Sequence, residues 1–195
     1  MVDIDIGTGA VTTGEGGWPA TWNVIAKGNP ANATGTIDTI EIYSADDLTD
    51  VKVGTFYGSG TSYTNRDYVT IGSVTSGSKQ TFTEDSGSNT ISIEVVEGDL
   101  IGIYWSSGFI EQETHSGVGF YYKSGDQFGA GEQTYTFIDG REISVYGTGE
   151  EAAVGFTRKI KIGGTFQDKP IKTKVAGTFE DKPIKIKVGG TFQDA

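Results

Sequence analysis

The sequence predicts an all-β protein in which a jelly-roll-like β-sandwich is followed by a short β-repeat tail. Two observations predict the sandwich. Apolar and polar side chains alternate in short segments at spacings of roughly eight to twelve residues, and Gly, Ser and Asn turns separate these segments. Glycine is very frequent, at 30 of 195 residues, and no segment has helical periodicity. A third observation, a repeated sequence at the end of the chain, predicts the tail.

The expected strands of the sandwich lie between residues 18 and 150. The clearest is 37–44, in which strict alternation turns Ile37 away from Ile40 and Ile42. The segment LIGIYW, residues 100–105, is the most apolar and should be the central strand of a sheet. The remaining expected strands are 18–26, 51–57, 63–74, 79–83, 91–95, 118–123, 134–138 and 142–146.

The chain is expected to divide into three regions. Val2, Ile4 and Ile6 alternate with aspartates as in a first short strand, and the Gly-rich run 7–17 follows as a loop. We therefore expect a flexible N-terminal arm at 1–17, the β-sandwich body at 18–150 and the thirteen-residue β-repeat tail at 151–195. Residues 147–151 should form the hinge between body and tail.

The tail repeats itself with a period of thirteen residues. GTFQDKPIK at 164–172 returns as GTFEDKPIK at 177–185 and begins a third time at 190. β-Branched residues alternate with lysines, Asp-Lys-Pro has the chemistry of a turn, and a Gly-containing pair supplies the opposite turn, which together predict a meander of very short strands.

A thin ribbon of this kind is marginal in water by itself. It should therefore pack on its own body or on the same ribbon of neighbouring subunits. The residues expected at this assembly tail are Phe166, Ile171, Val175, Phe179, Ile184, Ile186, Val188 and Phe192.

The repeated pattern Gly-Thr-aromatic-x-x-Lys-Pro-x-Lys resembles the short C-terminal repeats of bacteriophage and prophage tail and fibre proteins. In those repeats the aromatic residue is usually Trp, whereas here it is Phe. Segment 35–149 is also similar to small sandwich domains of phage structural proteins, in the stretches VKVGTF, GDLIGI and ISVYGTG. The resemblance implies a structural protein of a virus particle. The alternative is a lineage-specific β-tail without a viral connection.

Charge and composition exclude several function classes. Residues 1–150 hold 6 Lys/Arg and 21 Asp/Glu, whereas 151–195 hold 9 and 5, so the body lacks the basic surface that nucleic acid requires. The lysines of the tail are interpreted as guards of an exposed sheet edge. No segment is apolar enough for membrane insertion, and no signal peptide is visible, so we expect a protein made in a host cytoplasm. The resemblance to phage proteins implies that its location is the virion.

One histidine offers a candidate chemical site. Glu111, Glu113 and His115 would share a face on a strand, close enough for a metal or an acid/base pair. Gly108 and Gly117 bracket the stretch, however, which favours a solvated acidic loop.

A second acidic stretch offers oxygen ligands for calcium at Asp46, Asp47 and Asp50. It lacks the Gly and the terminal Glu of a calcium loop, which favours an ordinary turn. We therefore expect no enzyme activity, no catalytic residues, no cofactor and no metal.

Aromatic residues are the more informative candidates, because exposed rings serve as stacking platforms or interface anchors. A glycan-binding site is hypothesised at Trp18, Trp22, Tyr57, Tyr63 and Tyr68. The alternative is that most of these rings are core or subunit contacts.

Together these patterns predict a virion structural protein, namely a phage-like fibre, tail-tip or capsid-decorating subunit that assembles through its β-repeat tail. The expected partners are other copies of the chain, with a trimer favoured, other virion proteins, and a host glycan. One alternative is a free-standing carbohydrate-binding module, a monomer with a ring-lined groove. The other is a strand-exchanging surface filament subunit, in which the tail or the N-terminal arm completes a neighbour's sheet.

Overall fold

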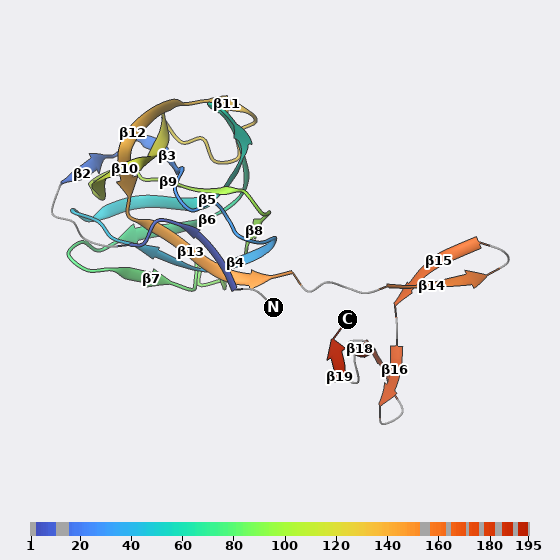
Figure 1. The fold of residues 1–195 in the computed structure, drawn as a ribbon. Helices are drawn as coiled ribbons and strands as arrows, with labels where there is room; N and C mark the ends of the chain where they lie inside the picture. Colours follow the sequence, from blue (N-terminus) through green and yellow to red (C-terminus); the bar gives the residue numbers. More distant parts are fainter. Residues whose placement is uncertain are drawn as a thin grey trace. The chain divides into compact units, whose positions relative to one another are not determined.

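The computed structural model describes residues 3–10 and 16–152, without the side chains of 115 and 116, and the backbone of 157–162, 165–170, 172–175, 178–181, 185–188 and 191–194. The contacts within the chain divide it into two units, Met1–Ala152 and Ala153–Ala195. All regular elements of the described residues are β-strands (Figure 1). Each unit is considered by itself below.

Two antiparallel sheets form the first unit. In the narrower sheet the order is β1 (Asp3–Gly7), β13 (Val145–Glu151) and β4 (Gly35–Ile42), and both β7 (Gln80–Phe82) and β8 (Ile93–Val95) pair with the far edge of β4. In the wider sheet the order is β11 (Gln133–Thr134), β6 (Ser62–Val74), β5 (Leu48–Ser59), β9 (Leu100–Tyr104), β3 (Trp22–Ala26), β10 (Phe109–Ser124) and β12 (Thr136–Ile143), and β2 (Gly17–Pro19) also pairs with β10.

The strand pairing is that of a jelly roll. β5 and β6 form a hairpin, and the pairs β4–β8, β3–β9 and β1–β13 follow outward from it along the chain. Successive pairs fall alternately in the wider and the narrower sheet, as they do when one long hairpin wraps into two sheets. The prediction of an all-β, jelly-roll-like sandwich is confirmed. The most apolar segment is central, as predicted, because β9 lies between β5 and β3.

Aliphatic side chains from both sheets fill the space between them. Ile37, Ile40 and Ile42 of β4 are fully buried there together with Ile101 and Ile103 of β9. The predicted alternation along 37–44 is therefore wrong at one point. Thr148 and Gly149 of β13 pair with Thr39 and Ile37, so Asp38 is an extra residue in β4. Such a bulge reverses the alternation and brings Ile37 to the buried side.

The N-terminal segment differs from its prediction in part. The expected first short strand is present as β1 (Asp3–Gly7), but it pairs with β13 along its whole length and so belongs to the sandwich instead of a flexible arm. Ile4 and Ile6 are fully buried in the core between the sheets. The sandwich therefore begins at the start of the described chain.

The loop between β3 and β4 covers the second edge of β1. The Asp5 backbone N–H donates a hydrogen bond to Asn32 Oδ1 (3.0 Å), and Asn32 Nδ2 donates to the Asp3 carbonyl (3.0 Å). Asn29 Nδ2 donates to the Gly7 carbonyl (3.1 Å), and the Gly7 N–H donates to the Asn29 carbonyl (2.9 Å). These bonds satisfy backbone groups that would otherwise be open to a further strand.

A second, aromatic core lies on the side of the wider sheet that faces away from the narrower one. Its buried members are Ile25, Phe56, Tyr63, Leu100, Tyr121, Phe128 and Tyr135. Phe128 and Tyr135 belong to the connection between β10 and β12, and the Tyr135 hydroxyl donates to Asn23 Oδ1 (2.9 Å). This connection therefore acts as a third layer over the sheet.

The described residues of the second unit form three two-stranded antiparallel hairpins. They are β14 (Thr157–Ile162) with β15 (Thr165–Pro170), β16 (Lys172–Val175) with β17 (Thr178–Asp181), and β18 (Lys185–Val188) with β19 (Thr191–Asp194). Among the described residues, strands pair within a hairpin and not between hairpins, which differs from the continuous meander expected. In the first repeat, residues 168–170 extend β15 instead of forming the predicted turn.

The three hairpins share one register. The strand-end pairs are Ile162↔Thr165, Val175↔Thr178 and Val188↔Thr191, and in each hairpin the Phe of the repeat is paired with a Lys. Of the residues predicted at the assembly tail, Ile171 and Ile184 lie outside the described residues.

Candidate functional site

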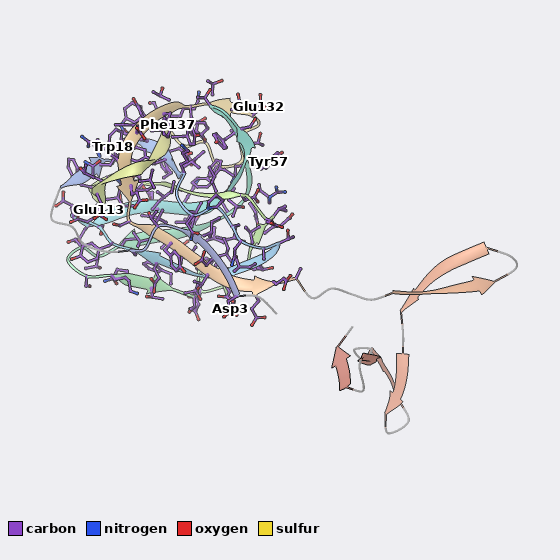
Figure 2. The ribbon with its side chains drawn as sticks, viewed as in Figure 1. Asp3, Trp18, Tyr57, Glu113, Glu132 and Phe137 are labelled. Atoms are coloured by element: carbon purple, nitrogen blue, oxygen red, sulfur yellow. The ribbon has the colours of Figure 1, made fainter. Side chains whose placement is uncertain are left out.

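The five residues of the hypothesised glycan site fall into two separate groups. Trp18 and Trp22 lie on β2 and β3, and Tyr122 contacts both rings, with centroids 5.3 Å and 5.5 Å away. The three tyrosines of the set lie on β5 and β6. Figure 2 shows Trp18 and Tyr57 on opposite sides of the body, so the structure does not bring the set together into one groove.

The two tryptophans are half-buried and pack against the aliphatic core. The Trp18 ring meets Phe120 edge-on, with ring centroids 4.9 Å apart, and its Nε1 is buried without a hydrogen-bond partner in the described structure. Their main contribution is to hold β2 and β3 to the neighbouring strand β10.

Two of the three tyrosines are engaged in the aromatic layer. Tyr63 is buried against Tyr121 (centroids 4.7 Å apart), and burial is the main cause that raises its pKa above the ordinary value of 10.0. Tyr68 is more exposed, but its ring centroid lies 5.1 Å from that of Phe128 and 5.5 Å from Lys52 Nζ. Lys52 is also paired with Asp126 (2.5 Å), which raises the pKa of Lys52.

Tyr57 is different because much of its ring is open to solvent. At 46% it is the most exposed of the large hydrophobic side chains that the structure describes. The Arg66 guanidinium lies over the ring, with Cζ 4.7 Å from the centroid. Thr64 is directly opposite Tyr57 in the β5–β6 hairpin.

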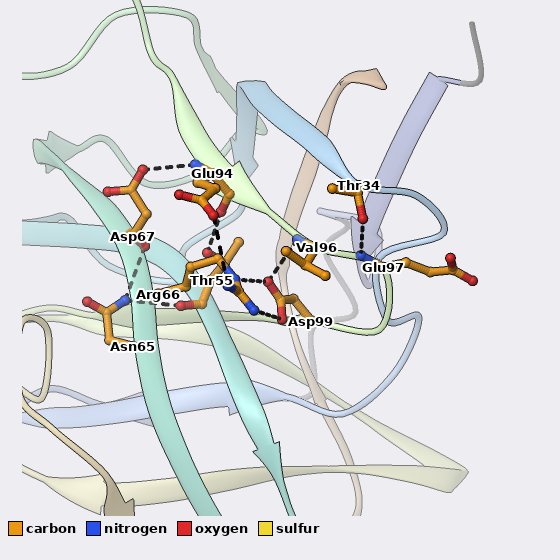
Figure 3. Close-up of polar contacts among 9 residues, drawn as sticks. All are labelled: Thr34, Thr55, Asn65, Arg66, Asp67, Glu94, Val96, Glu97 and Asp99. Carbon is orange, nitrogen blue, oxygen red and sulfur yellow. Dashed lines mark hydrogen bonds and ion pairs between the residues drawn. The ribbon is translucent and has the colours of Figure 1, made fainter. Parts of the chain in front are cut away.

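A buried ion pair holds Arg66 in this position (Figure 3). Arg66 Nε donates to Asp99 Oδ2 (2.5 Å) and Nη2 donates to Asp99 Oδ1 (3.0 Å), which is two-point recognition of a carboxylate. Asp99 is only 2% exposed and also accepts the Val96 N–H (2.9 Å). The hydrogen bond with Asp99 is the main cause that raises the pKa of Arg66. The guanidinium therefore stays charged and fixed.

A β-bulge aims the Arg66 side chain at Asp99. Thr55 pairs with Asp67 and Phe56 pairs with Asn65, so Arg66 is an extra residue in β6. A bulge of this kind turns one side chain out of the regular alternation of its strand.

Polar contacts around Arg66 join the two sheets. Thr55 of β5 donates its hydroxyl to the Glu94 carbonyl of β8 (2.7 Å), and the Glu94 N–H donates to Asp67 Oδ2 of β6 (2.8 Å). The Glu94 carboxylate lies 3.9 Å from Arg66 Nη1, but its side chain is 66% exposed. Figure 3 shows these groups gathered beside the β5–β6 hairpin. These contacts form one polar cluster between the two sheets, made of Arg66, Asp99, Glu94, Asp67 and Thr55.

Comparison with protein-family models, with curated proteins and with solved structures finds no match to this chain.

The acidic stretch around His115 is not the predicted loop, because it lies within strand β10. The Glu111 backbone closes a ring of three hydrogen bonds at the junction of the sheets: Glu111 N–H to the Tyr43 carbonyl, Tyr43 N–H to the Ser144 carbonyl, and Ser144 N–H to the Glu111 carbonyl. The Glu111 side chain is 7% exposed, and its Oε2 has no hydrogen-bond partner in the described structure. Pairing on both sides, which the flanking glycines do not reveal, makes this stretch a strand.

Two of the three aspartates considered for calcium, Asp47 and Asp50, make separate side-chain contacts. Asp47 Oδ1 accepts the Ser76 N–H (2.8 Å), and hydrogen bonds from Ser76 lower the pKa of Asp47. Asp50 Oδ2 accepts the Ser106 hydroxyl (2.6 Å). In the described part of the chain no group of three His, Cys, Asp or Glu side chains is placed to hold a metal ion.

Sequence reasoning did not single out Arg66 or Asp99. Asp99 follows Glu97-Gly98, just before the predicted strand 100–105, while Arg66 lies in a polar stretch of a predicted strand. Their pairing depends on a bulge and on contact between sheets, for which the sequence gives no local signal.

The described residues contain no helix long and apolar enough to cross a membrane.

Proposed function

We propose that this protein is a structural subunit of a virus particle, a phage-like fibre, tail-tip or capsid-decorating protein, which assembles through its repeat tail. The observation that carries the proposal is the tail, in which three successive hairpins have one register. The resemblance of the repeats to those of phage tail and fibre proteins supports the same conclusion.

Physical reasoning links these hairpins to assembly. A two-stranded sheet of four to six residues per strand buries too little surface to be stable by itself. Packing hairpins of identical sequence pattern from several copies gives each of them a buried face. A closed homo-oligomer follows, with a trimer favoured because thin ribbons can pack around a threefold axis.

Native molar mass tests the proposal. Light scattering should give a defined oligomer for the full chain and a monomer for a chain that ends at Ala152, the last residue of the first unit. Far-UV circular dichroism should show that the shorter chain retains its β-structure. A monomeric full chain would contradict assembly through the tail.

Strand exchange through Asp3–Gly7 is disfavoured, because β1 already pairs with β13 and because Asn29 and Asn32 bind its second edge. Open-ended polymers in the same light-scattering experiment would favour strand exchange through the tail. The carbohydrate-binding alternative is favoured by one observation, the exposed ring of Tyr57.

A further inference from the structure

We propose that Tyr57 is the stacking platform of a saccharide-binding site, at which the apolar face of a pyranose ring lies on the exposed side of the tyrosine ring. The site lies wholly within the first unit. It goes beyond the proposed assembly function and stands whether or not the tail assembles the protein.

The ring of Tyr57 is held in place before any ligand arrives. Arg66 lies against it with Cζ 4.7 Å from the centroid, and two hydrogen bonds to the buried Asp99 fix Arg66. The guanidinium lies over one face of the ring and Tyr57 is still 46% exposed, so we place the ligand on the face away from Arg66. A platform that is already ordered loses little conformational entropy on binding, which favours affinity.

Polar groups beside the ring suit a ligand that carries hydroxyl groups. The Glu94 carboxylate is 66% exposed and lies 3.9 Å from the same guanidinium that contacts Tyr57, so it can accept a hydrogen bond from a hydroxyl. Thr64 is directly opposite Tyr57, and the turn that follows β5 is rich in Ser, Thr and Gly. One apolar ring framed by hydroxyl and carboxylate groups matches a small ligand with one apolar face and a polar rim.

A protein partner fits this surface less well. Stable protein interfaces bury about 800 Å² per partner and contain several aromatic or aliphatic anchors. The exposed large hydrophobic side chains in the described structure are Tyr57, Tyr68 and Phe109. Tyr68 packs on Phe128, and Phe109 lies on β10 beside β2, so neither extends the Tyr57 surface into a larger apolar patch.

The full-length protein can be tested on an array of immobilised neutral oligosaccharides built from glucose, galactose, mannose and N-acetylglucosamine. The strongest binder is then titrated by calorimetry. We expect Tyr57→Ala to weaken binding by about tenfold or more, as loss of one stacked ring does in other ligand sites. Tyr57→Phe keeps the ring and should stay within about threefold of the original affinity, since the loss of one hydroxyl costs little.

Phe109→Ala is the matched control, because it removes an equally exposed ring elsewhere on the body and should leave the affinity unchanged. Unchanged thermal unfolding of Tyr57→Ala would show that its fold is intact. Absence of binding to every oligosaccharide on the array would overturn the proposal, as would full affinity in Tyr57→Ala. The native mass of Tyr57→Ala should equal that of the original chain, so failure of this site is distinguishable from failure of assembly through the tail.

Discussion

At the scale of single residues, the ion pair of Arg66 and Asp99 is the most consequential contact in the body. Replacing Asp99 by Ala would leave the guanidinium, whose side chain is 22% exposed, without its carboxylate partner. We expect a loss of about 2 to 3 kcal/mol in the free energy of unfolding, somewhat less than for a fully buried pair. Urea unfolding followed by circular dichroism measures this loss.

The exposed carboxylate next to the same arginine supplies the control. Glu94 Oε1 lies 3.9 Å from Arg66 Nη1 at an exposed position, so Glu94→Ala should change stability by no more than about 0.5 kcal/mol. Equal losses in the two variants would show that the burial of Asp99 does not matter.

A second residue-scale prediction concerns pH. The backbone and side chain of Asn89, and the Gly87 N–H, hydrogen-bond to Asp85 and lower its pKa below the ordinary value of 3.8. A lowered folded-state pKa means that this group stabilises the fold above the unfolded-state pKa, and that the contribution disappears as pH falls through the folded-state pKa. Asn89→Ala should move the pKa of Asp85 back toward 3.8, as measured by an NMR titration of the Asp85 carboxyl. The variant keeps the backbone N–H of residue 89, so the pKa should return only part of the way, and an unchanged pKa would exclude the Asn89 side chain as a cause.

At the scale of elements, the covering of β1 makes a prediction about the edge of a sheet. Asn32→Ala removes the acceptor of the Asp5 N–H and the donor to the Asp3 carbonyl. Because these bonds are exposed, we expect a loss of only about 1 kcal/mol. The Asp5 amide should exchange its hydrogen faster, while the Gly7 amide, bonded to the Asn29 carbonyl, should not change. Equal acceleration at both amides would indicate that the whole strand detaches.

The same scale shows which elements the sequence could predict. Alternation of period two predicted the strands, and the continuous apolar run at 100–105 predicted the central position of β9, because a strand buried on both faces is apolar throughout. The bulges at Asp38 and Arg66 escaped prediction, since a bulge is defined by the register of the partner strand. The flanking Gly108 and Gly117 predict a loop around Glu111, whereas pairing with β2 and β12 makes this segment part of β10.

The candidate site was less predictable than the fold. Composition identified Tyr57 together with four other aromatic residues, but only the three-dimensional contacts separate the open ring from the packed ones. Tyr63 lies under the β10–β12 connection, in which Phe128 is a single aromatic residue in a polar, Gly-rich stretch and Tyr135 lies in the predicted strand 134–138. The composition of this stretch does not predict that it covers a sheet.

At the scale of the whole molecule, the repeat tail makes the most informative prediction about assembly. Each hairpin pairs only within itself among the described strands, so the three behave as separate units in sequence. If each contributes its own contact between copies, the stability of the oligomer should fall stepwise as hairpins are removed, as in other repeat proteins. Chains that end at Asp181, at Pro170 and at Ala152 retain two, one and none of the hairpins.

Sedimentation over a dilution series measures this dependence. The concentration at which the oligomer dissociates should rise with each hairpin lost, and the chain ending at Ala152 should be monomeric throughout. The control is a full-length chain with Lys174→Gln and Lys187→Gln, in which the tail loses two positive charges and keeps all three hairpins. If packing dominates over charge, this chain should dissociate near the original concentration. Complete dissociation on loss of the last hairpin alone would instead mean that the three hairpins form one cooperative unit. If the lysine substitutions weaken the oligomer as much as truncation does, charge drives the association.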